Sequence, residues 1–439
     1  TFLKGDIVLF AGAGISTENR SVFPYTLYEE VCGDIKIKPS EGSSFPKVMD
    51  KFCNQPNGRS MLLQKIRNRF SYIWSFSELY LRATAFHQEL STLYPIDTIV
   101  TTNWDDYFEK KCGAIPFVTA EDFAFWSMPG RKVFKIHGSV NSYGSLVLTS
   151  QDYRSCYRKL SSGIMGSYLK LILATKTIIY VGFSFNDEDF LRIHKLLSKE
   201  MGELLPHSYI VTLDKDSDTR FRKNGLTPIY TDGTYFLSVI KHCLVQQGAM
   251  PSDDRYELIQ YLLFKVQTEH EKFSKYSKLR KHPDDVYSLC YQDGLLHALN
   301  RIISLQNTGY YSHLCNVRNT IRSYKQFAKE KRKAGRYDNL AYIEGYINGV
   351  FAMLIDHKDE MESLYIELMP LYYIYGCHEN VVTLSQYKKI MRNSGILHKK
   401  AHKFAEQLVQ KHIGDTNLTF QHTPFLIYHF GKLLGHLIR

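Results

Sequence analysis

The sequence has no two cysteines close enough to form a C-x-x-C pair. Its eight cysteines are scattered over 439 residues, so the spacing of a zinc ribbon is absent, and buried thiols in a reducing compartment are expected. It also lacks any apolar run near the roughly 18 residues that a membrane-spanning helix needs. The first residues, which Lys4 and Asp6 interrupt, predict a strand rather than a signal peptide. We therefore expect a cytoplasmic protein with no zinc, no other metal site and no membrane contact.

The chain carries a net charge of +11, from 55 basic and 44 acidic residues. Residues 251–439 hold 26 basic and 19 acidic residues, and therefore most of this excess. A positive surplus is compatible with nucleic acid, an anionic cofactor or an acidic protein partner. No long block of one sign is present, and no helix-turn-helix, zinc-finger or RNP signature is evident. We do not expect direct nucleic-acid binding, and an acidic partner for the second half is the better hypothesis.

The first 250 residues alternate short apolar runs with helical patterns such as Ile73–Leu93 and Asp187–Lys199. The apolar runs are nearly continuous rather than alternating, as in parallel strands that are covered on both faces. The predicted strands are Asp6–Ala11, Thr98–Thr102, Val133–Ile136, Thr177–Val181 and Ser208–Leu213. This order predicts an α/β fold with a Rossmann-like, doubly wound parallel sheet.

A segment with the composition of a linker, with Gly, Pro and Ser, follows Gln247 and ends in two aspartates. Beyond it, strand signals nearly vanish and no fixed internal repeat is found. Helices are predicted at 254–279, 284–305, 311–334, 337–356, 359–375, 379–393, 397–413 and 421–438. We therefore predict two domains, an α/β domain over residues 1–250 and an all-α domain over residues 251–439.

A glycine turn directly follows the first predicted strand. It reads Gly12-Ala13-Gly14-Ile15-Ser16. Such a turn lets the backbone approach a pyrophosphate closely, with the next helix aiming free N–H groups at it. Thr17 stands where the third glycine of the dinucleotide fingerprint would fall, so a plain turn is the alternative.

Polar residues also follow the other strands. Asn103 and Asp105 come after the second strand, where Asn103 could bind sugar hydroxyls or a water, or one of the two could simply cap the next helix. His137 comes before a glycine at the end of the third strand and could act as a general base or be structural. After the fourth strand come Gly182, Ser184, Asn186 and Asp187.

The shared position of these motifs is stronger evidence for a ligand site than any single motif. Each set lies just past the carboxyl end of a predicted strand, and in an open α/β sheet those ends form the edge where ligands bind. The wording GAGIS, TTNWD, HGS and GFSFND in this order resembles the sirtuin family of NAD-consuming enzymes over about residues 5–240. The GFSFND wording is more similar to the bacterial defence branch than to the deacylases.

The resemblance implies a role for each matched residue. Asn103 would hold the nicotinamide ribose and a water, and His137 would be the catalytic base. Asp105 and Asp187 would orient the site, although an ordinary helix start explains each equally well. NAD+, the implied substrate, would be bound by Gly12, Ala13, Gly14, Ser16, Thr17, Arg20, Asp105, Gly182, Ser184, Asn186 and Asp187.

Two departures from the deacylase pattern matter. The four zinc cysteines are missing, and the Pro-Asp-Phe-Arg segment that follows GAGIS in deacylases is replaced by Thr17–Pro24, which leaves Arg20 only as a candidate. Both departures weaken the prediction of a protein deacylase, and neither argues against cleavage of NAD+. A deacylase and a catalytically silent NAD-sensing module are the alternative functions.

The helical half resembles the sirtuin-like NADases of anti-phage systems. One such arrangement pairs a sirtuin-like subunit with a HerA-type ATPase, whereas Thoeris effectors typically end in an α/β domain and Argonaute-associated sirtuins carry a β-containing module. The helical second half therefore favours the HerA-type pairing. The resemblance implies an NAD+ hydrolase of anti-phage defence that is controlled by homo-oligomerisation or by this partner.

Overall fold

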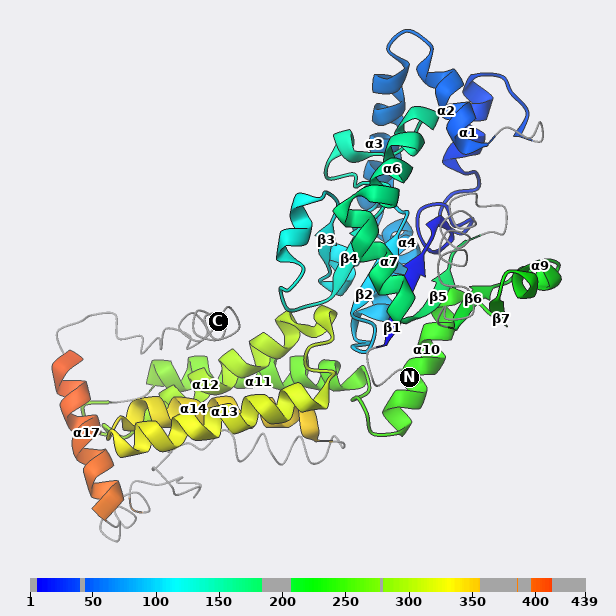
Figure 1. Cartoon of the computed structure of the whole chain (residues 1–439). Helices are drawn as coiled ribbons and strands as arrows, with labels where there is room; N and C mark the ends of the chain where they lie inside the picture. Colours follow the sequence, from blue (N-terminus) through cyan, green and yellow to red (C-terminus); the bar gives the residue numbers. More distant parts are fainter. Residues whose placement is uncertain are drawn as a thin grey trace. The chain divides into compact units, whose positions relative to one another are not determined.

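The computed structural model describes residues 6–39, 44–183, 207–276, 279–355, 385 and 396–412. The chain divides into two compact units, which are labelled by element in Figure 1. The first unit runs to Leu244 and includes Asn307–Gly309, and the second contains Val245–Gln306 and the residues from Tyr310 onward. The division falls inside helix α10 (Gly233–Gln246), shortly before the boundary placed at residue 250 from composition.

A seven-stranded, fully parallel sheet forms the centre of the first unit, in the order β3-β4-β2-β1-β5-β6-β7. The strands are β1 (Ile7–Ala11), β2 (Thr98–Thr101), β3 (Ile115–Phe117), β4 (Lys132–Lys135), β5 (Thr177–Val181), β6 (Ser208–Thr212) and β7 (Leu226–Tyr230). Every residue of β1 and β2 is buried, because helices cover both faces of the sheet. The predicted Rossmann-like parallel sheet is confirmed.

The sequence does not predict the two edge strands, β3 and β7. Both are interrupted by a proline, Pro116 and Pro228, which argues against a strand in the middle of a sheet. Ile115 and Thr231 donate their N–H groups toward the neighbouring strand. Because successive residues of a strand point their N–H groups to opposite sides, both prolines have their nitrogen on the outer side, where no ladder bond is lost.

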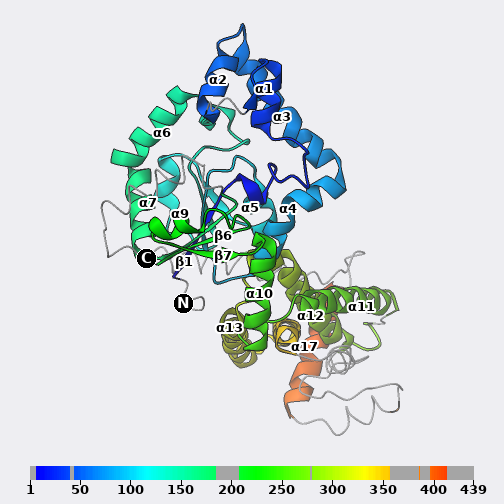
Figure 2. The same cartoon turned by 90° about the vertical axis from the view of Figure 1, so that its right-hand side faces the viewer.

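Helices pack on both faces of this sheet, and Figure 2 shows α6 and α7 on one side with α4 and α5 on the other. The helices of the first unit are α1 (Leu27–Asp34), α2 (Phe45–Cys53), α3 (Gly58–Ser75), α4 (Ser77–Ser91), α5 (Tyr107–Cys112), α6 (Ser150–Ser162), α7 (Ile164–Thr175), α9 (Asp218–Lys223) and α10. The single helix predicted at Ile73–Leu93 is wrong, because Phe76 is extended and separates α3 from α4. The predicted helix Asp187–Lys199 lies outside the described residues.

The second unit is helical throughout its described part, which confirms the all-α prediction there. Its helices are α11 (Asp254–Tyr276), α12 (Asp285–Ser304), α13 (Leu314–Lys333), α14 (Tyr337–Phe351) and α17 (Ile396–His412), with short turns η7 (Gln306–Thr308) and η8 (Ala352–Leu354). The helices predicted at 359–375 and 421–438 lie outside the described residues, and so does 379–393 except for residue 385. Among the described helices of both units, none is long and apolar enough to cross a membrane.

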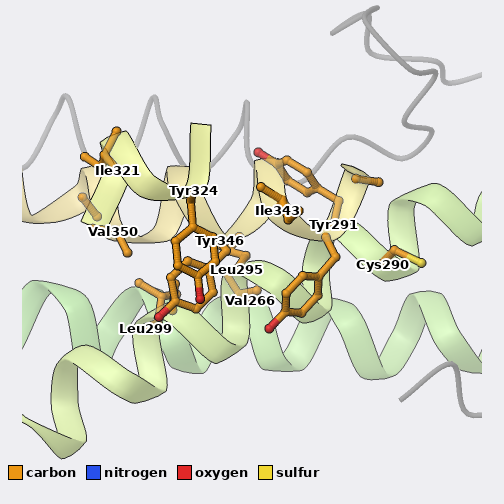
Figure 3. Packing of buried hydrophobic residues seen from close by; sticks show 14 of the residues in the cluster. Val266, Cys290, Tyr291, Leu295, Leu299, Ile321, Tyr324, Ile343, Tyr346 and Val350 are labelled. Carbon is orange, nitrogen blue, oxygen red and sulfur yellow. The ribbon is translucent and has the colours of Figure 1, made fainter. Parts of the chain in front are cut away.

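Two glycines let α12 and α14 approach each other closely. A Cβ on Gly294 would come within 1.9 Å of the Tyr342 carbonyl oxygen, and one on Gly345 within 1.9 Å of the Tyr291 carbonyl oxygen. Tyrosines fill the core beside this contact, and Figure 3 shows Tyr291, Tyr324 and Tyr346 among aliphatic side chains. The rings of Tyr324 and Tyr346 stack with centroids 4.1 Å apart. Side chains larger than glycine at either position would force the two helices apart.

The carboxyl group of Glu344 on α14 makes the stability of the second unit depend on pH. Burial raises the pKa of Glu344 from 4.5 to about 7, although Arg332 lies 3.6 Å away and opposes the shift. Between these two pH values the folded chain holds a proton that the unfolded chain has released. The stabilising contribution is therefore complete below about pH 4.5 and is lost as the pH rises through 7.

We expect Glu344→Gln to be more stable than the wild type at pH 8, on the order of 2 kcal/mol, and nearly equal to it at pH 4. Urea unfolding at both pH values measures the difference. Glu330→Gln, on the exposed side of α13, is the matched control and should leave the pH dependence unchanged. Parallel pH curves for wild type and Glu344→Gln would show that Glu344 does not titrate near neutrality.

Candidate active site

The carboxyl ends of neighbouring strands form one edge of the sheet, which we call the crest. The last residue pair between β2 and β4 joins Thr101 to Lys135. Asn103 and His137 each lie two residues beyond this pair, so the register of the ladder brings them to neighbouring positions on the crest. Both are buried, with 5% and 3% of their surface exposed.

The loops that leave β1 and β5 meet backbone to backbone at the point where the strand order reverses. Gly12 N–H donates to the Val181 carbonyl at 2.8 Å, and Gly14 N–H donates to the Gly182 carbonyl at 2.9 Å. A Cβ on Gly12 or Gly14 would lie 2.6 or 2.9 Å from the Gly182 oxygen. Gly182 itself has a φ of +73°, which favours glycine. The glycines of the motif are therefore required by loop packing at the switch point, which is where ligands of such sheets bind.

The helix expected directly after the glycine turn is wrong. The chain instead makes a three-residue turn, η2 (Ala13–Ile15), and the first α-helix begins at Leu27 after an N-cap at Thr26. The N–H groups of Gly12 and Gly14 are engaged by the β5 loop, as described above. Ala13 and Gly14 are exposed on the crest, so these residues offer the accessible backbone of this loop.

Asn103 is held by one end of its amide while the other end has no partner. Its Nδ2 donates to the Gly12 carbonyl at 3.1 Å, and its backbone N–H donates to Thr101 Oγ1 at 3.0 Å. Its Oδ1 is buried and accepts no hydrogen bond from the described residues. The Trp104 Nε1–H next to it is likewise buried and unpartnered among them. A buried polar atom without a partner carries a free-energy cost, which a bound ligand or water would remove.

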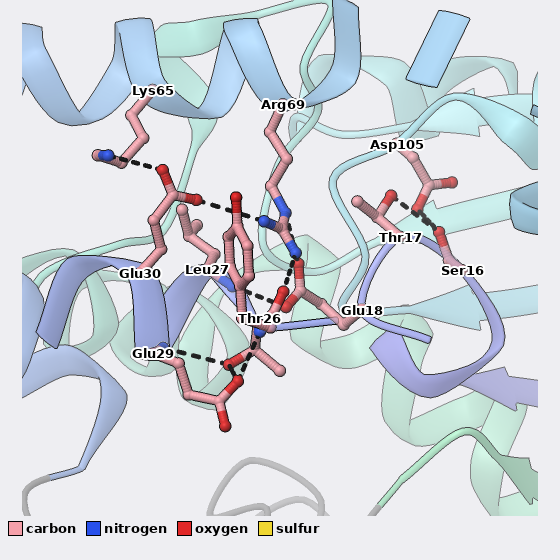
Figure 4. Close-up of polar contacts among 11 residues, drawn as sticks. Ser16, Thr17, Glu18, Thr26, Leu27, Glu29, Glu30, Lys65, Arg69 and Asp105 are labelled. Carbon is pink, nitrogen blue, oxygen red and sulfur yellow. Dashed lines mark hydrogen bonds and ion pairs between the residues drawn. The ribbon is translucent and has the colours of Figure 1, made fainter. Parts of the chain in front are cut away.

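Asp105 ties the second loop of the crest to the first. Its Oδ2 accepts the Ser16 hydroxyl at 2.6 Å, and its Oδ1 accepts the Tyr107 N–H at 3.2 Å. Thr17 lies beside this pair, with its hydroxyl 3.4 Å from that of Ser16, as Figure 4 shows. Asp105 therefore bonds to the first residue of α5 and links the loops after β1 and β2. Its role toward a ligand stays a prediction.

His137 is enclosed by the segment that follows β4. Its carbonyl accepts the Val147 N–H at 3.1 Å, and the ring of Tyr153 from α6 packs edge-on against the imidazole at 5.1 Å. Gly138 has a φ of +86°, and a Cβ there would lie 2.2 Å from the Ser145 carbonyl oxygen. The glycine after the histidine is thus needed for the turn that folds this segment back toward the crest.

Arg20, the candidate cation for NAD+, bonds to the start of α1 in this structure. Arg20 is exposed, and its guanidinium bonds to Glu29 at 2.8 Å and to the Pro24 carbonyl at 2.5 Å. The same guanidinium lowers the pKa of Glu29 to about 2. Arg20 therefore braces the start of α1 in this structure.

A different arginine, Arg69 on α3, anchors the segment that runs from the glycine loop to α1. It bonds to the Tyr25 carbonyl at 2.7 Å, forms ion pairs with Glu18 at 3.2 Å and Glu30 at 3.3 Å, and lies 3.9 Å from the centroid of the Phe23 ring. Figure 4 shows it between the two carboxylates. Burial raises the pKa of Glu18, and Arg69 opposes this shift. Nothing in the local sequence distinguishes Arg69 from the other cations of its helix.

Three predicted ligand-binding residues, Ser184, Asn186 and Asp187, lie outside the described residues. Of the predicted set, the structure brings the glycine loop, Asn103, Asp105, His137 and Gly182 to one crest, and it leaves Arg20 at the surface. Among the residues it describes, no cluster of three or more His, Cys, Asp or Glu side chains is arranged to hold a metal ion.

Residues 97–229, which include most of the parallel sheet, match the family model described as the SIR2-like domain. The NAD(+) hydrolase ThsA of Cytobacillus dafuensis is 29% identical over 212 residues, which are 46% of this chain and 41% of that protein. The NAD(+) hydrolase ThsA of Enterococcus faecium is 29% identical over 198 residues, 43% and 39% of the two chains.

Defense-associated sirtuin 2 of Bacillus subtilis is 20% identical over 194 residues, which are 42% of this chain and 18% of that protein. The chain thus spans less than half the length of the curated relatives it matches. The resemblance to sirtuins is confirmed for the fold, and proteins named as NAD(+) hydrolases are among the relatives.

The contacts of Arg69 predict that this side chain anchors the segment between the glycine loop and α1. Arg69→Met should lower the free energy of unfolding by roughly 2 kcal/mol, between the values for exposed and fully buried ion pairs, because Glu18 and Glu30 lose their partner. It should also speed proteolytic cleavage within residues 18–26. Arg67→Met, an exposed neighbour on the same helix, is the control. Equal thermal unfolding and equal cleavage of the two variants would contradict an anchoring role.

Proposed function

We propose that the chain is an NAD+ hydrolase that cleaves the glycosidic bond between nicotinamide and ribose and releases nicotinamide and ADP-ribose. The observation that carries this proposal is the in-register placement of Asn103 and His137 on the crest, with the buried Oδ1 of Asn103 left without a partner among the described residues. The relatives named NAD(+) hydrolases support the same reaction. Depletion of NAD in anti-phage defence is proposed from the defence-associated relative.

Asn103 would orient both the sugar and the attacking water. Its Nδ2 is fixed by the Gly12 carbonyl, so the direction of the free Oδ1 is fixed as well. A carbonyl oxygen of this kind accepts from a ribose hydroxyl or from water. Prior placement of a water molecule near the anomeric carbon reduces the entropic cost of hydrolysis.

His137 would take up the proton that hydrolysis releases. The C1′–N bond breaks with both electrons moving to the pyridinium nitrogen, so nicotinamide leaves as a neutral molecule and needs little acid catalysis. Water forms the new C1′–O bond through a transition state with oxocarbenium character, as in glycoside hydrolysis. The proton lost by water, or by a ribose hydroxyl, passes to the imidazole, a role typically worth about 10²–10⁴-fold in rate.

The phosphates of NAD+ would lie over the switch point between β1 and β5. There we assign them to Gly12, Ala13, Gly14, Ser16 and Thr17, with Gly182, Ser184, Asn186 and Asp187 following β5. Ala13 and Gly14 are exposed, which supports this assignment because a phosphate group can approach the loop there. Arg20 would contribute only if it left Glu29.

Replacing either central side chain should abolish NAD+ loss in a protein that remains folded. For Asn103→Ala and His137→Ala we expect the turnover number to fall at least about 10²-fold, measured as nicotinamide release by liquid chromatography. Asn68→Ala and His242→Ala, at exposed positions of the same unit, are matched controls and should retain the wild-type rate. Circular dichroism checks the fold of all four variants.

The outcome also separates the alternatives. NAD+ left intact by the wild-type protein, alone and with its partner, would refute hydrolysis. Binding of NAD+ without turnover in every assembly state would instead support a sensing module. Nicotinamide release that depends on an acetylated peptide would support a deacylase.

We further propose that the helical unit restrains this activity through homo-oligomerisation or through docking of a HerA-type ATPase. Supporting this, α13 carries seven cations and one carboxylate in twenty residues. Four of the cations, Arg318, Arg322, Lys325 and Lys329, are exposed and line a groove next to apolar residues of α13, α14 and η8. Such a groove complements an acidic, partly apolar segment of a partner protein.

Charge reversal on α13 tests this docking. We expect Lys325→Glu/Lys329→Glu to weaken co-elution with a co-expressed HerA-type ATPase at least about tenfold, a change of about 1.4 kcal/mol in binding free energy. Lys272→Glu/Lys333→Glu makes the same change of charge outside the groove and should not. Equal co-elution of both variants would exclude the groove as the docking site.

A further inference from the structure

The last residue of β4 is a lysine that is completely buried. Lys135 has 0% of its surface exposed, and the two residues before it, Val133 and Phe134, are apolar and buried. Removing an ammonium group from water is costly unless nearby acceptors compensate for the lost hydration. The acceptors that contact Lys135 Nζ therefore show which part of the chain the buried ammonium group holds in place.

All acceptors of this ammonium group come from the segment that follows Asn103. Lys135 Nζ donates to the Asp105 carbonyl, donates to the Trp104 carbonyl at 3.4 Å and forms an ion pair with Glu109 Oε1 at 3.0 Å. A lysine has three N–H donors and no acceptor. The three donors thus meet three acceptors, two on the loop after β2 and one on α5.

The carbonyl of Trp104 receives a second bond from the other side of the site. Val140 N–H, three residues after His137, donates to it at 2.8 Å. The loop carrying Asn103 is therefore fastened to the chain just before His137, through Lys135, and just after it, through Val140. Asp105 passes the same constraint to Ser16 in the glycine loop by its 2.6 Å hydrogen bond.

We propose that Lys135 is a positioning residue for the candidate site: through the carbonyls of Trp104 and Asp105 it holds Asn103 and His137 at the separation that NAD+ cleavage requires. This inference rests on the proposed hydrolase function. Lys135 lies two residues before His137, and its acceptors begin one residue after Asn103. It therefore links the stretches of main chain that carry these two side chains. Its ammonium group is engaged by protein acceptors and takes no part in the chemistry.

Stability alone gives a weak reason for this arrangement. A buried ion pair can often be replaced by apolar side chains of similar volume at no cost in stability. What an apolar pair cannot do is bind two successive main-chain carbonyls and so fix the path of the loop. A displacement of about 1 Å between reacting groups can cost about 10²-fold in rate, which sets the size of the effect expected here.

The test compares Glu109→Gln with Lys135→Met/Glu109→Gln. Neither variant contains the buried Glu109 carboxylate, so the double variant removes the ammonium group without leaving that carboxylate unpaired. In Glu109→Gln the ammonium group keeps its two carbonyl acceptors, and the Gln amide oxygen can accept its third N–H. We expect the double variant to have a turnover number about 10²-fold below that of Glu109→Gln, with KM for NAD+ changed less than about threefold. The reason is that Lys135 Nζ bonds directly only to the loop after β2 and to α5, and it reaches the phosphate-facing glycine loop indirectly, through Asp105 and Ser16. Lys132→Met, on the same strand but bonded to the Gly130 carbonyl and close to the Trp126 ring, should keep both constants.

Each outcome decides between a positioning role and a purely structural one. Equal turnover numbers for Glu109→Gln and the double variant would overturn the proposal, as would a rise in KM that accounts for the whole loss. Should the double variant unfold, Lys135→Ala assayed with added propylamine replaces it, and recovery of the turnover number would support the proposal while no recovery would overturn it. A wild-type protein without NAD+ cleavage would refute the proposed function itself, a result separate from any difference between variants.

Discussion

The arrangement of the crest depends on a contact in which two loops approach each other through main-chain atoms. Gly12 and Gly14 bond to the carbonyls of Val181 and Gly182 at 2.8 and 2.9 Å, which fixes the end of β1 against the end of β5. Asn103 then takes its orientation from the Gly12 carbonyl, and Ser16 takes its own from Asp105. An enlarged residue at the glycine contact would therefore disturb Asn103 as well as the glycine loop itself.

Much of the fold can be predicted from the sequence because the central strands of a parallel sheet are apolar on both faces. The five such strands are apparent as uninterrupted apolar runs. The edge strands are not, since Pro116 and Pro228 contradict the usual composition of a strand and only their position at the edge makes them acceptable. The break at Phe76 between α3 and α4 is equally hidden, because no proline or glycine marks it.

Some residues around the candidate site could likewise be placed from the sequence, and others could not. Asn103 and His137 could be predicted because each lies at a fixed offset from the end of a recognisable strand, and the register of parallel strands does the rest. Arg69, Tyr153 and Glu109 could not, because their relation to the site depends on how α3, α6 and α5 pack. Lys135 did leave a signal, a charged residue directly after two apolar residues at the end of a strand. Its role depends on three acceptors that only the folded loop after β2 and α5 supply. The glycine motif was misleading in one respect, since a short turn follows it where a helix was expected.

The prolines of the two edge strands also limit how copies of this molecule can associate. An open sheet edge normally offers a row of N–H and carbonyl groups to which a strand of another chain can add. Pro116 and Pro228 each remove an outward N–H from the middle of such a row. Continuous growth of the sheet from one copy to the next is thereby disfavoured, and this holds equally for amyloid-like stacking and for β-strand exchange. Any assembly of copies through this unit must then be made by side chains on helices and loops, whose contacts can be formed and released without unfolding the sheet.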